Sequence, residues 1–130
     1  EITDEEYKDF YSSIAHDSHN LIVAGTNDAD MVLAGNTVRK NKGGLAFALN
    51  GQVVGELPLP VAGLMSTKSA ETVEEKLQAL KAALEAHGIS EDIDAFMTLA
   101  FVSLPVIPKL RLNTYGIVDV DAQQIVPAVF

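Results

Sequence analysis

The sequence contains no cysteine. This absence excludes disulfide bonds, zinc sites built from thiolates and any mechanism that needs a cysteine nucleophile. A chain without cysteine suits a reducing compartment, so we expect a cytoplasmic protein.

Basic residues are scarce, because 9 lysines and arginines stand against 18 aspartates and glutamates, which gives a net charge of −9. A surface this acidic repels phosphate backbones, so nucleic acid is not expected as a partner. No apolar run approaches the roughly 18 residues of a membrane span, and we expect no membrane contact. The first residues, EITDEEYKDF, are acidic and do not resemble a signal peptide.

The length of 130 residues and the hydrophobic content of 48% predict one domain over residues 1–130, with a core that needs no disulfide or structural metal. The chain begins on Glu1 and not on Met, so we expect a piece of a longer protein. The sequence leaves the oligomeric state open, and a homo-oligomer is compatible with it.

The first half of the chain contains several residues that are typical of helix ends and turns. The pair Thr3 and Glu6 forms a capping-box pattern and predicts a helix over 4–11. Extended runs are expected at about 12–16 and 20–25, around turn residues 17–19. A helix capped by Asn27 should end at the glycines 43–44. Asn50-Gly51 predicts a type I′ hairpin turn between two apolar strands.

The second half predicts a loop over 61–69, with Leu64 and Met65 as apolar anchors, and a helix from Ser69 to His87. Strands are expected at about 97–104, 117–120 and 124–129, the first of them central because its sequence is apolar on both faces. The order is then approximately ββαββαβββ. This predicts the α+β class, with a single mixed sheet and helices packed on it.

A dense polar cluster precedes the strand at 20–25. Three explanations remain open: a metal site, a polar turn that begins a strand, and a surface that completes a site built elsewhere. Extended structure would send residues 16 and 19 to opposite faces and leave a metal without a common ligand set, whereas a helix would bring them together. The cluster residues are His16, Asp17, Ser18, His19 and Asn20.

Familiar catalytic motifs are missing from the sequence. It contains no G-x-S-x-G elbow, no phosphate-binding G-x-x-x-x-G-K-[ST] loop and no H-E-x-x-H pair. A triad of Ser18, His19 and Asp17 is disfavoured, because direct neighbours in sequence rarely reach the required geometry. From its residues alone, the chain is a globular α+β domain without a complete active site.

Four separated motifs, in order, resemble the C-terminal domain of prokaryotic adenine deaminases, members of the amidohydrolase superfamily. The resemblance covers about Ser12 to Phe130, with one mild departure, since Ala95 stands where the family pattern has proline. The motifs are AHDSHN with GTND, then ELPLPVAGLMS, DAFMTLAFVSLPVIP and GIVDV.

The resemblance implies a metal-dependent barrel upstream that hydrolyses adenine to hypoxanthine and ammonia, with manganese or iron in a two-metal centre. The metal ligands would belong to that barrel. This chain has three histidines and no H-x-H pair, so no ligand or catalytic residue is carried over, and the chain alone should be inactive.

The resemblance also implies that the cluster, together with Met65 and Ser66, lies against the barrel near its pocket. The alternative is a free-standing interaction or ligand-binding module of shared ancestry. A coding sequence upstream with H-x-H after an N-terminal strand would favour the enzyme, and a start codon near Glu1 would favour the module.

Overall fold

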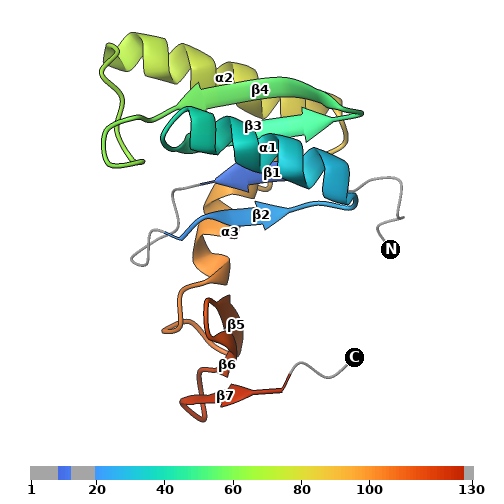
Figure 1. The fold of residues 1–130 in the computed structure, drawn as a ribbon, viewed down its shortest axis with the longest axis vertical. Coiled ribbons are helices and arrows are strands. Elements are labelled where there is room, and N and C mark those ends of the chain that lie inside the picture. Colours follow the sequence, from blue (N-terminus) through green and yellow to red (C-terminus); the bar gives the residue numbers. More distant parts are fainter. Residues whose placement is uncertain (1–8, 13–19, 128–130) are drawn as a thin grey trace.

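The computed structural model describes residues 9–12 and 20–127 and confirms the α+β class (Figure 1). In chain order the elements are β1 (Asp9–Ser12), β2 (Ile22–Ala24), α1 (Asp28–Lys40), β3 (Gly44–Leu49), β4 (Gln52–Pro58), α2 (Ala70–Ala86), α3 (Ala95–Val102), β5 (Leu110–Asn113), β6 (Gly116–Asp119) and β7 (Gln124–Val126).

The strands form two antiparallel sheets, so the prediction of a single mixed sheet is wrong. One sheet has four strands in the order β2-β1-β3-β4, and the other has three in the order β5-β6-β7. Helix α1 covers one face of the four-stranded sheet, and α2 and α3 pack on the other. The three-stranded sheet lies beyond the far end of α3 (Figure 1).

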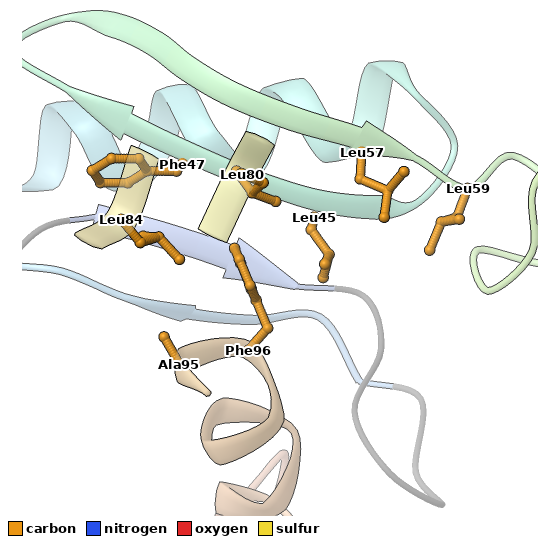
Figure 2. Close-up of a cluster of buried hydrophobic side chains, with 8 residues drawn as sticks. All are labelled: Leu45, Phe47, Leu57, Leu59, Leu80, Leu84, Ala95 and Phe96. Carbon is orange, nitrogen blue, oxygen red and sulfur yellow. The ribbon is translucent and has the colours of Figure 1, made fainter. Parts of the chain in front are cut away.

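Strand β3 is buried on both faces, because α2 packs on one face and α1 on the other. Large and small side chains alternate along the strand, so each helix contacts one kind. Leu45 and Phe47 point toward α2, whereas Ala46 and Ala48 contact α1. Figure 2 shows the larger cluster, with side chains of β3 and β4 meeting those of the two helices; its members are Leu45, Phe47, Leu57, Leu59, Leu80, Leu84, Ala95 and Phe96. The small residues let α1 approach the sheet closely.

The predicted helices at Asn27 and Ser69 and the hairpin between β3 and β4 are confirmed. The side chains of Asn27 and Ser69 each accept a backbone N–H in the first turn of their helix. Asn50 and Gly51 have φ values of 53° and 75°, the positive values that a type I′ turn requires.

The strand predicted at 97–104 is wrong, because residues 95–102 form α3. Asp94 caps the helix by accepting the N–H of Met97 at 3.0 Å, and it also pairs with Lys81 at 2.8 Å. A short apolar run that is buried on several sides has no period that separates a strand from a helix. Ala95 is the first helical residue, where proline is also favoured, so its departure from the family pattern does not disturb the element.

The ends of the described chain also differ from expectation. Residues 9–12 form β1, which contradicts the end of the helix predicted over 4–11, and residues 1–8 lie outside the described part. The strands predicted at 117–120 and 124–129 correspond to β6 and β7. Strand β5 was not predicted, although Leu110 and Leu112 alternate with polar residues along it.

Candidate functional site

One end of the four-stranded sheet gathers the segments that flank the predicted site. The register pairs Ser12 with both Ile22 and Leu45, and pairs Leu45 with Leu57. Strands β1 and β4 therefore end where β2 and β3 begin. Three parts of the chain lie at this end: Ser12, which precedes the polar cluster, Asn20, the described member of that cluster, and the loop that follows β4. We call it the Ser12 end of the sheet.

Three of the predicted site residues belong to the described chain: Asn20, Met65 and Ser66. Their side chains differ in exposure, because Asn20 and Ser66 are half-buried and Met65 is 58% exposed. The remaining four lie outside the described residues, and these are His16, Asp17, Ser18 and His19.

Asn20 borders a cavity of about 250 Å³ between β2, the end of α3 and the turn after β5. Polar groups from distant parts of the chain meet here, since Ser103, Asn113 and Thr114 line the same cavity. Pockets for drug-sized ligands usually measure about 300–1,000 Å³. This cavity is smaller than that range. It lies between the two sheets, so we interpret it as a gap in their packing.

The loop over residues 59–69 is held against the end of α1 by two glycines. A Cβ atom on Gly43 would lie 2.2 Å from the Cα of Gly63, a distance that real side chains do not reach. The N–H of Leu59 donates to the carbonyl of Gly43 at 3.0 Å, and the Leu59 side chain is buried. The pair Gly43-Gly44 therefore follows the end of α1, and the missing side chain of Gly43 also leaves room for the loop.

Within this loop, the prediction that Met65 is an apolar anchor is wrong. The backbones of Val61 and Met65 bridge each other, which turns the Met65 side chain outward, and Leu59 is the buried residue instead. The Ser66 hydroxyl accepts the N–H of Lys68 at 3.0 Å. Ser66 lines a separate cavity of about 100 Å³ against α2, so the structure does not bring Ser66 and Asn20 into one pocket.

A buried carboxylate at the opposite end of the sheet went unrecognised in the sequence. Asp30 in α1 is 3% exposed, and its side chain accepts the N–H of Gly51 at 2.7 Å and of Asn50 at 2.8 Å. Hydrogen bonds from the Asn27 side chain and then from Gly51 lower the pKa of Asp30 from its ordinary 3.8, although burial opposes them. The residue fastens α1 to the hairpin turn.

The carboxylate of Asp30 already accepts three hydrogen bonds from within the chain and is buried, which favours a structural role. The spacing of Asn27 and Asp30 is the available signal, since the Asn27 side chain accepts the N–H of Asp30 and donates to its carboxylate. The contact with the turn depends on the tertiary structure, because 20 and 21 positions separate Asp30 from its turn partners.

Metal-ligating side chains do not cluster in residues 9–12 and 20–127, where no three of His, Cys, Asp or Glu come together. His87 caps α2, its Nδ1 lies 2.7 Å from the carbonyl of Ala83, and its ring meets Phe47 edge-on at 5.7 Å. These contacts hold the half-buried His87 against the core residue Phe47. No helix of the described chain is both long and apolar enough to cross a membrane.

Comparison with protein families gives a match over residues 8–124 to the family described as the adenine deaminase C-terminal domain. The chain belongs to this family. It is 50% identical over 116 residues to "Adenine deaminase 2" of Carboxydothermus hydrogenoformans, covering 89% of this chain and 20% of the relative. It is 54% identical over 109 residues to "Adenine deaminase" of Kosmotoga olearia, covering 84% and 19%.

An "Adenine deaminase" of Bacillus velezensis shows the same proportions, with 46% identity over 116 residues, 89% of this chain and 20% of the relative. The chain thus spans about a fifth of the length of the curated relatives it matches. Membership in the family accounts for the four motifs and their order. It concerns the C-terminal domain only.

Proposed function

We propose that this domain is the non-catalytic C-terminal part of an adenine deaminase, a hydrolase of purine metabolism that converts adenine to hypoxanthine and ammonia. The family match and the names of the relatives support this proposal. In this proposal the domain packs on its own N-terminal catalytic barrel, adenine binds in that barrel, and the protein is cytoplasmic. The net charge of −9 supports a protein that binds neither nucleic acid nor anionic membranes.

Manganese or iron would be held by the barrel and not by this domain. The described residues do not fit a metal, because they present no group of three suitable side chains. What this domain contributes is a surface, and its effect on the reaction would be to position loops and substrate.

The Ser12 end of the sheet is the surface that we propose completes the active-site mouth. The supporting observation is that Ser12, Asn20 and the loop carrying Met65 all lie at the same end of the sheet, where the Met65 side chain is exposed. A thioether and polar side chains at the rim of a pocket could hold barrel loops or touch a purine. The proposed surface consists of His16, Asp17, Ser18, His19, Asn20, Met65 and Ser66.

The test compares Asp17→Ala, His19→Ala and Met65→Ala in the full-length protein. Turnover of adenine per folded molecule should fall by about tenfold or more, since small displacements near a reacting centre are costly. The free energy of unfolding should change by only about 0.5 kcal/mol, as is usual for surface positions. Gln52→Ala, an exposed change at the opposite end of the sheet, should alter neither quantity.

Unchanged turnover in all three variants would show that the Ser12 end is only scaffolding. If the full-length protein leaves adenine unchanged with manganese or iron supplied, the proposed activity is wrong. The alternative, a free-standing ligand-binding module, would then be the better assignment.

A further inference from the structure

The three-stranded sheet forms a lobe without a core. We call residues 105–127, which contain β5, β6 and β7, the C-terminal lobe. Within it, no residue is buried, whereas the four-stranded sheet contains two clusters of fully enclosed side chains. Three antiparallel strands need a packed hydrophobic face to be stable in water. Nothing in the described chain buries a hydrophobic face of the lobe in this way.

The register shows where such a face lies. Leu112 pairs with Ile117, and Ile117 pairs with Val126, so the three side chains form a row on one side of the lobe. Leu110 belongs to the same side, because it is two residues from Leu112 along β5. Leu110 and Leu112 are 55% and 56% exposed. We call these four residues the leucine face.

The opposite side of the lobe does not offer the solvated polar face that antiparallel sheets usually have. Val118 and Ile125 pair there, and Ile125 is 60% exposed. Tyr115, at the tip of the turn between β5 and β6, is 81% exposed. Apolar side chains that gather in an exposed patch mark an interaction surface, whereas single ones do not.

Arg111 lies on the opposite side of the lobe from the leucine face, because it pairs with Val118. Its guanidinium donates to the carbonyls of Leu110 at 2.6 Å and Pro108 at 2.9 Å, while its Nε is buried without an acceptor in the described chain. A buried donor that lacks an acceptor is costly. Because this atom is buried inside the described chain and lies on the other side of the lobe, it takes no part in a contact at the leucine face.

The C-terminal lobe packs loosely against the rest of the domain. The cavity of about 250 Å³ beside Asn20 separates Leu112 and Asn113 of the lobe from Leu21 and Val23 at β2. Packing within the described chain therefore does little to hold the lobe in place. Contact with a further body on the leucine face would hold it.

We propose that the leucine face docks on the polypeptide upstream of this domain, which presents an apolar surface to it. Resting on the proposed function, this inference adds a contact separate from the active-site mouth. The size of the relatives supports this occupant, since about four fifths of their length lies outside the matched segment. A covalently linked surface is present at high effective concentration, so a modest patch suffices.

A second copy of the domain fits the leucine face less well. The lobe itself carries Lys109, Arg111, Asp119 and Asp121, whose charges cancel, so the net charge of −9 resides on the rest of the chain. Docking two lobes face to face would bring two strongly acidic bodies together, and their repulsion opposes the contact.

The test places a photoreactive side chain on the leucine face of the full-length protein, as Leu110→p-benzoylphenylalanine. Irradiation should join residue 110 to peptides upstream of this domain within one chain. Adding Leu112→Asp should lower the yield about tenfold, because a carboxylate is costly inside an apolar contact. Adding Val53→Asp should leave the yield unchanged, because Val53 is an exposed apolar residue on β4, outside the lobe.

Cross-links between two copies, or none to upstream peptides, would overturn the inference. Equal yields with Leu112→Asp and without it would overturn the leucine face as the contact. Adenine turnover, measured on the protein without the photoreactive group, separates the two proposals. Cross-linking without turnover supports docking and contradicts the proposed activity, whereas turnover without cross-linking does the reverse.

Discussion

Replacing Asp30 should destabilise the domain more than any other change of a single carboxylate in α1. Its oxygens accept the backbone N–H groups of Asn50 and Gly51, and Asp30→Asn would turn an amide N–H₂ toward one of these donors. Hydrogen bonds to a charged group contribute roughly 1.5–3 kcal/mol each, and less where water can replace them. Because the turn is exposed, we expect a total loss of about 2–4 kcal/mol.

Urea denaturation at pH 7 measures this loss, with Asp28→Asn as the matched control. Asp28 lies in the same first turn of α1 and is exposed, so its replacement removes only a helix-dipole contribution of about 0.3–1 kcal/mol. In thermal unfolding, the Asp30 variant should melt about 10 °C below the wild type. Equal losses in the two variants would refute the idea that Asp30 fastens α1 to the turn.

The same pair of variants predicts a pH dependence. The Asn27 side chain and then the Gly51 N–H lower the pKa of Asp30 in the folded state, so its stabilising contribution is complete above the ordinary value of 3.8. The contribution is lost as the pH falls through the lower pKa of the folded state. The stability difference between wild type and Asp30→Asn should therefore stay constant from about pH 5 to 7 and shrink in stronger acid. A difference that persists in acid would contradict this assignment.

Three further outcomes are expected. Gly51→Val should cost roughly 1–2 kcal/mol from its positive φ alone, since a Cβ there meets no atom within 4 Å, and an unchanged denaturation midpoint would disprove the turn. Gly43→Ala should cost more, about 2–4 kcal/mol, despite its smaller side chain, because its Cβ would collide with the Gly63 backbone. The isolated chain should neither deaminate adenine nor bind manganese or zinc with submicromolar affinity; turnover above a metal blank, or a tight site lost in His19→Ala, would show otherwise.

Several elements could be predicted because neighbours in sequence decide them. Asn27 and Ser69 cap the helices that follow them through contacts three residues away. Asn50-Gly51 makes its own turn, and the glycines at 43–44 end α1. The family resemblance was equally readable, because it rests on the order and spacing of motifs along the chain.

The candidate site was only partly predictable. Polar character and the family motifs pick out the cluster and Met65-Ser66 in the sequence, and the strand register places Asn20 and the Met65 loop at one end of the sheet. That Asn20 and Ser66 line different cavities depends on α2, α3 and β5, which surround them from other parts of the chain. No local pattern encodes such neighbours.

By itself, the sequence determined the caps, the hairpin turn, the helix that begins after Ser69, the acidic charge and the family. The tertiary structure decided that residues 95–102 form a helix and not a strand, that the strands form two separate sheets, and that Asp30 binds the hairpin turn. The physical reason is the range of the interactions. Caps and turns satisfy backbone groups within a few residues, whereas burial, sheet pairing and the fate of a buried charge depend on side chains that only folding brings together.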